Sequence, residues 1–315
     1  MPGLPLTTLR LGTRKSALAL WQATFVRDRL LALYPDLVIT TVPMTTEGDR
    51  LLGAPLLAAG GKALFTKELE QGLMEGRIDL AVHSMKDVVA ELPEGLGIGA
   101  ILAREDPRDA LVTPLPVTDI ASLPHGCRVG TASLRRQSQL HHKRPDLRLS
   151  PLRGNVNSRL ARLDAGAFDA IVLAAAGLKR LGFADRIRAW LPVETSLPAA
   201  GQGAIGIECR SDDAATRDLI APLNDPETAL CVTTERALTA ALGGGCRLPI
   251  AAFARLAGDT VTLQALVGEP DGSRLLVQEA RGPASDPQGL ARRVAGDLQA
   301  QGAGAIIDRL MAEGS

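Results

Sequence analysis

The stretch Ile78-Asp79-Leu80-Ala81-Val82-His83-Ser84-Met85-Lys86-Asp87-Val88 joins a short apolar run to a polar cluster. Residues 78–82 predict a buried strand, and the next five residues follow its carboxyl end. In open α/β sheets, ligands bind just outside the carboxyl ends of strands. Ser84, Lys86 and Asp87 are therefore candidate site residues. The alternative is a surface Lys–Asp pair, which would contribute little to stability.

The chain before this strand alternates strand and helix signals. Residues 9–13 predict a strand, and Ser16 is placed to cap a helix whose apolar residues recur at intervals of three and four. A strand at 37–42 and a helix at 66–75 continue the alternation, which indicates an α/β layer fold. Arg14 and Ser16 would lie at a helix N-terminus, a geometry that binds anions; a solvated basic turn is an equally good interpretation.

A polar linker at residues 103–107 leads into a second unit of the same kind. Its predicted strands are 111–113, 128–130, 147–149 and 168–174, the last ending in Gly177–Arg180. Two helices are expected to open at Thr131–Arg136 and Arg153–Val156, and both openings carry arginine.

Positive charge is concentrated in this second unit. The whole chain balances 35 Lys and Arg against 35 Asp and Glu, yet residues 126–165 contain nine Lys and Arg against two Asp, or 9 − 2 = +7. Arginines at several helix starts suit a ligand with several carboxylates or phosphates. The region lacks the aromatic residues that stack on bases, which argues against single-stranded nucleic acid, and no phosphate loop for a nucleoside triphosphate is present.

The last third of the chain has a different order of strand and helix signals. Residues 197–206 are rich in Gly, Ala and Pro and predict a crossing back to the first unit, with a strand at 204–207. A helix signal then begins at Asn224–Glu227, with Ala229, Leu230, Leu238 and Leu242 suggesting its apolar face. The remaining strands and helices predict a small α+β unit, at 250–256, 261–267, 273–280, 287–301 and 303–311.

Cys246 stands at the end of three glycines, Gly243–Gly245, and is followed by Arg247. Glycine leaves open space around the thiol, and the arginine would favour its thiolate form. The alternative interpretation is an inert cysteine after an ordinary helix end. The four cysteines form no Cys-x-x-Cys pair and no His-x-x-x-His motif occurs, so we expect neither a metal site nor a disulfide scaffold.

The bulk properties favour an ordinary cytoplasmic protein. With 315 residues, 46% of them apolar and 22% charged, the chain can hold two or three domains. No apolar run approaches the roughly 18–20 residues that span a bilayer, and the first ten residues lack an export-signal pattern. We therefore expect a cytoplasmic protein with no membrane or nucleic-acid partner, and nothing calls for more than a monomer.

Seven stretches in the same order resemble the porphobilinogen deaminases, also called hydroxymethylbilane synthases. Their positions are 13–22, 60–70, 83–87, 130–136, 152–156, 197–203 and the Cys246 loop. Together they extend over almost the whole chain. The sequence departs from the family pattern at Val89, where proline is usual, at Ala132, where serine is common, and at Asn157-Ser158, where Gly-Thr is common. None of these changes removes a charged or nucleophilic group.

The resemblance implies an α/β fold with two periplasmic-binding-protein-like lobes that contain mixed sheets, plus a small C-terminal α+β domain. The implied domains are 1–103 with 203–222, then 104–202, then 223–315. The implied reaction joins four porphobilinogen molecules head to tail, releases four ammonia and gives hydroxymethylbilane for tetrapyrrole (haem-type) biosynthesis. The implied cofactor is a dipyrromethane held by a thioether to Cys246.

The resemblance also assigns site residues. Asp87 would be the catalytic carboxylate. The cofactor would contact Ser84, Lys86, Thr131, Ser133, Arg135, Arg136 and Arg159. The substrate would contact Arg14, Ser16, Gln22, Lys62, Arg153 and Arg180. Each porphobilinogen carries two carboxylates, so a growing chain needs many cations, and a carboxylate would stabilise the cation that forms when ammonia leaves.

One further expectation and two alternative functions remain. The glycine-rich stretch from Pro43 to Gly61 is a candidate lid. One alternative is a two-lobed anion-binding protein without catalysis, which would leave the Cys246 loop unused. Another is a cysteine hydrolase, which needs a histidine base near Cys246; the nearest in sequence, His142, is about a hundred residues away.

Overall fold

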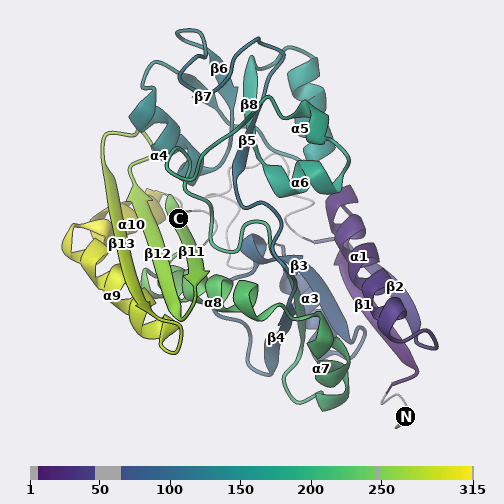
Figure 1. The fold of residues 1–315 in the computed structure, drawn as a ribbon. Coiled ribbons are helices and arrows are strands. Elements are labelled where there is room, and N and C mark those ends of the chain that lie inside the picture. Colours follow the sequence, from purple (N-terminus) through teal and green to yellow (C-terminus); the bar gives the residue numbers. More distant parts are fainter. Residues whose placement is uncertain (1–5, 47–64, 246–247, 314–315) are drawn as a thin grey trace.

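The computed structural model describes residues 6–46, 65–245 and 248–313, which form three sheets with their own helices (Figure 1). Cys246, Arg247, Lys62 and residues 47–61 of the expected lid lie outside the described residues. The fold class predicted from the sequence is confirmed, since two mixed α/β sheets are followed by a small antiparallel sheet covered by helices.

The first lobe is built on a five-stranded sheet with the order β2-β1-β3-β10-β4. Its strands are β1 (Thr8–Arg14), β2 (Val38–Met44), β3 (Leu80–Ser84), β4 (Leu96–Ile101) and β10 (Ile205–Arg210). Strand β1 runs parallel to β2 and β3, whereas β10 runs antiparallel to β3 and β4. Its helices are α1 (Ala17–Leu33), α3 (Lys67–Met74) and α7 (Ala214–Ile220).

The second lobe repeats this pattern with the order β7-β6-β8-β5-β9. Its strands are β5 (Asp109–Val112), β6 (Arg128–Gly130), β7 (Arg148–Ser150), β8 (Ala170–Ala174) and β9 (Ala189–Trp190). Strand β6 is parallel to β7 and β8, and β5 is antiparallel to its neighbours β8 and β9. Its helices are α4 (Leu134–Lys143), α5 (Val156–Asp164) and α6 (Ala175–Arg180).

The antiparallel strand of each lobe is delivered by a crossing between the lobes. Residues 102–108 carry the chain from β4 to β5, and residues 191–204 carry it back from β9 to β10. The return crossing confirms the prediction made from residues 197–206, because β10 inserts between β3 and β4. The carboxyl ends of the parallel strands in both lobes therefore face the region that the two crossings pass through (Figure 1).

The C-terminal sheet orders β11 (Ile250–Ala257), β12 (Thr260–Gly268) and β13 (Leu275–Pro283) as an antiparallel meander. One face packs on α8 (Pro226–Ala241), α9 (Pro287–Ala300) and α10 (Ala303–Glu313), and the helices and strands share one apolar core. The other face packs on Leu197 of the return crossing through Ala251, Phe253 and Leu266. As predicted, Asp225 caps α8, and Gly243 (φ 66°) follows its end.

Two helices were not expected from the sequence. Helix α6 begins directly after β8, where residues 177–180 were predicted to close the strand. Helix α7 has seven residues and buries only Thr216, Leu219 and Ile220, which is too short a pattern for helical periodicity to be recognised. The buried face of α8 also differs from the predicted one, since it contains the ionisable residue Glu235, and Ala229 and Leu230 are only partly buried.

Glu235 connects three parts of the fold. Its fully buried carboxylate accepts hydrogen bonds from Nη1 and Nη2 of Arg104 at 2.6 and 3.1 Å. It also accepts from the amides of Gly201 at 2.7 Å and Ala254 at 2.8 Å. Helix α8, both crossings and strand β11 are thus fixed to one another by a single side chain.

We predict that Glu235→Ala lowers the free energy of unfolding by about 3–5 kcal/mol, because it leaves the Arg104 guanidinium and two amides without an acceptor. Thr233→Ala, an exposed position of the same helix, should change it by no more than about 0.5 kcal/mol. Urea denaturation followed by circular dichroism measures both. Equal effects in the two variants would contradict this role of Glu235.

Candidate active site

The amino end of α1 places the first candidate residues. Ser16 caps the helix, with its hydroxyl accepting a hydrogen bond from the Ala19 amide at 3.3 Å. The buried hydroxyl of Thr13 donates to the Ala19 carbonyl at 3.0 Å, which fixes the turn between β1 and α1. At the end of β1, the Arg14 guanidinium lies 4.3 Å from the centre of the Phe65 ring. Arg14 and Ser16 are thus held at a positive helix end.

The end of β3 places the next group. The Ser84 hydroxyl accepts a hydrogen bond from Nε2 of the buried Gln22 at 2.9 Å. The chain then tightens into a 3₁₀ turn over Met85–Asp87, which presents Lys86 and Asp87 beyond the strand end. Close packing fixes this turn, because a Cβ on Gly206 of the neighbouring strand β10 would lie 2.0 Å from the Met85 sulfur. Glycine at this position leaves room for the Met85 side chain.

A cavity of about 50 Å³ lies between these two elements. Its lining includes five residues of the predicted site, namely Arg14, Ser16, Gln22, Ser84 and Asp87. None of the described residues donates a hydrogen bond to the Asp87 carboxylate, so its oxygens are available to a ligand. The first lobe therefore brings the predicted catalytic residue and three predicted substrate residues together.

The second lobe presents its candidates at two helix starts. Ser133 caps α4, and the Thr131 hydroxyl accepts from the Ser133 amide at 3.3 Å. At the start of α5, Arg159 donates from Nε to the Gly154 carbonyl at 2.7 Å. Gly154 has φ 106°, a conformation that side chains rarely adopt, so this turn depends on glycine. These residues lie at the carboxyl ends of β6 and β7.

Asp109 organises the arginines behind these helix starts. Its fully buried carboxylate accepts from Nη2 of Arg135 at 2.9 Å and from Nη2 of Arg136 at 2.7 Å. It also accepts from the Ser196 hydroxyl at 2.7 Å and the Gln202 amide at 3.0 Å. Burial opposes the ionised form, but the two guanidinium groups outweigh it and hold the pKa of Asp109 well below its usual value.

Arg136 keeps one donor for a ligand. Its Nη1 donates to the Val172 carbonyl at 3.1 Å, and its Nη2 is bonded to Asp109, whereas its buried Nε has no hydrogen-bond partner. A buried N–H without an acceptor is costly, so a carboxylate at this point would be stabilised. Arg135 differs, because its Nη1 and Nη2 are bonded to the Leu197 carbonyl and to Asp109.

Charges from the two lobes meet at this site. Burial, together with the nearby cations Arg136 and Arg159, lowers the pKa of Lys86 to about 8, although Asp87 and Asp109 oppose the shift. Burial and the charge of Arg136 lower the pKa of Arg159 to about 10, against the effect of Asp87. These mutual effects require the groups to be close, so Lys86 and Asp87 of the first lobe face arginines of the second.

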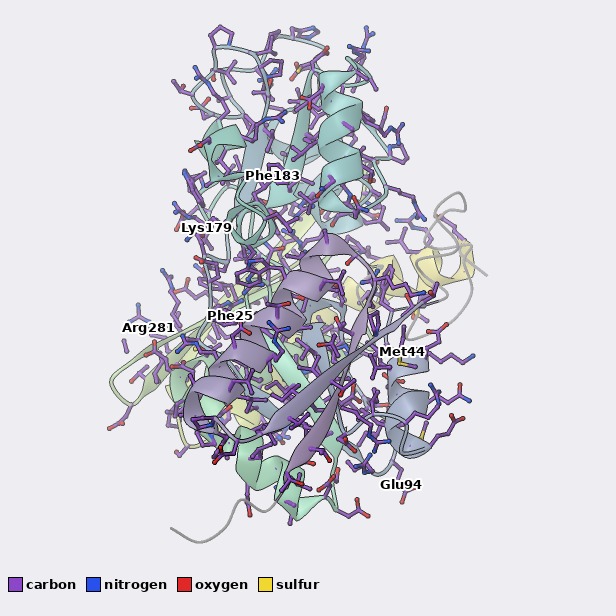
Figure 2. The ribbon with its side chains drawn as sticks, turned by 90° about the vertical axis from the view of Figure 1, so that its right-hand side faces the viewer. Phe25, Met44, Glu94, Lys179, Phe183 and Arg281 are labelled. Atoms are coloured by element: carbon purple, nitrogen blue, oxygen red, sulfur yellow. The ribbon has the colours of Figure 1, made fainter. Side chains whose placement is uncertain are left out.

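Arg180 lies at the junction of the lobes. Its Nη2 donates to the Gly203 carbonyl at 2.7 Å, and its guanidinium is 5.8 Å from the centre of the Trp21 ring on α1. Burial lowers its pKa to about 10. Next to it on α6, Lys179 pairs with Glu105 of the first crossing, and Figure 2 shows Lys179 between Phe183 of the upper lobe and Phe25 of the lower one.

Several of the cations counted in residues 126–165 are paired with acids in the structure. Four of the nine cations form ion pairs with three acids, since Arg135 and Arg136 share Asp109, Arg128 pairs with Asp169 and Arg144 with Asp146. Asp109 and Asp169 lie outside residues 126–165, whereas Asp146 lies inside this range and was already counted. Arg153 lies just ahead of α5, and burial lowers its pKa.

Sequence reasoning missed Asp109. It opens an otherwise apolar strand, and an acid in such a position is a signal for a buried partner, but the partner arginines lie 26 and 27 residues further on. Over the parts of the chain described here, no group of three His, Cys, Asp or Glu side chains is arranged to hold a metal ion. Within the same ranges, no helix is long and apolar enough to cross a membrane.

The fold and the site define a class of protein, one with two α/β lobes whose facing ends bring cations around a carboxylate. Among solved structures, the VFT2 domain of BvgS from Bordetella pertussis is similar at 17% identity and TM-score 0.42, covering 68% of this chain and 85% of that one. The sulphonate-binding protein SsuA from Escherichia coli is similar at 16% identity and TM-score 0.41, covering 74% and 70%.

Two family models match nearly the whole chain. Residues 9–218 match the dipyrromethane cofactor-binding domain of porphobilinogen deaminase, and residues 229–300 match the C-terminal domain of porphobilinogen deaminase. The chain therefore belongs to the porphobilinogen deaminase family. It is a transferase that polymerises porphobilinogen to hydroxymethylbilane in tetrapyrrole biosynthesis and uses a dipyrromethane cofactor. This excludes the alternative of an anion-binding protein without catalysis.

We predict that Asp109→Asn lowers the free energy of unfolding by about 3 kcal/mol at pH 7, because two buried arginines lose their counter-charge. The folded-state pKa of Asp109 lies below its unfolded value of about 3.9, so its contribution is complete above that pH and is lost as the pH falls through the folded-state pKa.

Urea denaturation of both proteins at pH 7, 5 and 3 tests this dependence. The difference between them should be the same at pH 7 and 5 and smaller at pH 3. The matched control is Asp212→Asn, an exposed position that should leave the stability unchanged. A difference that grows as the pH falls would contradict the assignment.

Proposed function

We propose that Asp87 is the catalytic carboxylate of this transferase and that Cys246 carries the dipyrromethane through a thioether. The observation that supports this best is that none of the described residues donates a hydrogen bond to the Asp87 carboxylate. Cations from both lobes nevertheless lie near it. A carboxylate in such a setting is held for a ligand group rather than for the fold. Cys246 itself lies outside the described residues, and its role rests on the family resemblance.

The residues around Asp87 fit a cofactor with several carboxylates. Arg136 would use its buried, unpaired Nε, and Lys86 and Arg159 would add charge from the two sides of the site. Thr131, Ser133 and Ser84 would contact the cofactor with their hydroxyls. Arg135 would contribute positive charge from behind, as its terminal nitrogens are bonded to the protein. When bound, the cofactor supplies the pyrrole to which the first substrate ring is joined.

The substrate would enter beside the start of α1. Arg14 and Ser16 would hold its carboxylates at the positive helix end, with Gln22 in the cavity wall and Arg153 and Arg180 on the side of the second lobe. Lys62 would line the same side. The partly desolvated arginines bind carboxylates more strongly than exposed ones do, because little water competes with them.

Asp87 would act on the aminomethyl group of porphobilinogen. As the carbon–nitrogen bond breaks, positive charge spreads over the pyrrole, and a carboxylate next to the ring nitrogen stabilises it. The same carboxylate would accept and return a proton during the step.

The domain boundaries remain part of the proposal, with 1–103 and 203–222 as domain 1, 104–202 as domain 2 and 223–315 as domain 3. They are supported by the two crossings, which lie at residues 102–108 and 191–204. We further propose a monomeric enzyme that acts in the cytoplasm, with porphobilinogen as its partner molecule and no nucleic acid or membrane.

Intact mass spectrometry tests the attachment site. We expect a mass excess equal to two linked pyrrole units on the purified enzyme, and its loss in Cys246→Ser. Cys231→Ser is the control, because Cys231 is buried in the C-terminal core and burial raises the pKa of its thiol to about 11, which leaves it unreactive. An excess retained in Cys246→Ser would contradict the assignment.

Steady-state assays of bilane formation test the catalytic residue. Asp87→Asn should lower kcat by about 10²–10⁴-fold, because the amide can neither balance the cation nor accept the proton. The fold should persist, since no described residue donates a hydrogen bond to this carboxylate. Glu91→Gln, an exposed carboxylate four residues further on, should leave kcat unchanged. Wild-type turnover by Asp87→Asn would overturn the role given to Asp87.

A further inference from the structure

Three ionisable side chains outside the predicted site are buried together beneath it. They come from three elements of the first lobe, Glu70 from α3, His83 from β3 and Glu208 from β10, and they are 4%, 5% and 0% exposed. Nε2 of His83 lies 2.8 Å from Oε2 of Glu208. By hydrogen-bond geometry, Nε2 of His83, both carboxylate oxygens of Glu208 and Oε1 of Glu70 have no partner among the described residues, so the His83–Glu208 contact is a close approach of opposite charges.

Such a cluster is costly unless it holds protons. Two carboxylates and one imidazole carry a net negative charge when both acids are ionised, and water cannot screen it. Burial and the charge of Glu208 raise the pKa of Glu70. Arg236 of α8 is in electrostatic range of Glu208, but its own donors are bonded to the carbonyls of residues 88–90.

The cluster reaches the active-site cavity through one of its members. His83 lines the same cavity as Asp87, together with Thr66, the residue that precedes α3. The cavity, at about 50 Å³, has room for a water molecule, and its lining contains His83, Ser84 and Asp87.

The established reaction needs a place to hold a proton. In each condensation the aminomethyl carbon–nitrogen bond breaks and its electron pair leaves on ammonia. A carbon–carbon bond forms to a pyrrole α-carbon, and that carbon then loses its proton. The substrate enters as an ammonium ion, so the α-carbon proton and ammonia leave together as NH₄⁺, with no oxidant or reductant. After the carbon–carbon bond forms, a base on the enzyme must accept the α-carbon proton and pass it to water, from which the released ammonia takes up a proton.

We propose that His83, Glu208 and Glu70 are positioning residues for this proton. His83 exchanges it with Asp87 through water in the cavity, Glu208 holds the imidazole by its Nε2, and Glu70 completes the buried group. This inference rests on the role proposed for Asp87. It adds three residues outside the predicted set of cofactor and substrate contacts, and it explains why ionisable groups are buried behind a carboxylate that has no donor among the described residues.

The test uses the enzyme with its covalent cofactor, checked by intact mass, and compares His83→Gln and Glu208→Gln with wild type. We expect kcat to fall by about 100-fold, the lower end of acid–base effects, with KM unchanged. The solvent deuterium isotope effect on kcat should rise, because proton transfer becomes slow. His141→Gln in the second lobe, whose ring contacts the Pro270 carbonyl, is the matched control and should change none of these values.

A second measurement does not depend on turnover. The imidazole N–H proton spectrum of the resting enzyme should contain a resonance that is absent in His83→Gln and is shifted or lost in Glu208→Gln. An unchanged resonance in Glu208→Gln would overturn the pairing.

The remaining outcomes also decide the proposal. Wild-type kcat and isotope effect in His83→Gln would overturn it, as would loss of the fold or of the cofactor in both variants, since the cluster would then be structural. Asp87→Asn is assayed in parallel. If Asp87→Asn is inactive and His83→Gln is fully active, only this inference fails; if Asp87→Asn is active, the proposed function fails as well.

Discussion

The buried carboxylate of Asp109 is the constraint on which the architecture depends. It is fully enclosed, and four donors surround it, two from arginines of α4 and two from the return crossing. An isolated ion there would be prohibitively costly, so strand β5, helix α4 and the crossing can only form together. The same contacts hold the guanidinium of Arg136, whose buried Nε has no hydrogen-bond partner among the described residues. Fold and site are thus specified by one set of hydrogen bonds.

This arrangement follows from the exchange of strands between the lobes. Because β5 and β10 each insert into a sheet of parallel strands, the chain must cross twice, and both crossings pass behind the site. Arginines then anchor the return crossing from several sides. Arg104 donates to the Gln202 carbonyl at 2.8 Å and Arg180 to the Gly203 carbonyl at 2.7 Å. The carbonyl groups of this glycine-rich segment are satisfied by side chains where no sheet is available.

The sequence predicted most of the strands and helices because their signals are local. Ser16 and Asp225 cap the helices that they were expected to cap, and β3 delivers Ser84 and Asp87 to one cavity as predicted. What it did not predict depends on pairing across distance. Asp109 and Glu208 lie in strands that look merely apolar, and their partners come from other elements. The charge count for residues 126–165 likewise left out two acids that pair with its arginines, because Asp109 and Asp169 lie outside that window.

The two kinds of buried acid in this molecule therefore have different physical meanings. Asp109 and Glu235 are surrounded by cations and amides, so their negative charge is fully balanced and serves the fold. Glu70 and Glu208 have oxygens without donors among the described residues, and Nε2 of His83, a group that can gain or lose a proton, lies 2.8 Å from Glu208. A fold that satisfies its structural acids so completely would be expected to satisfy these too, unless their protons are used. The incomplete bonding of this cluster, beside Asp87, is the physical reason to assign it to the reaction.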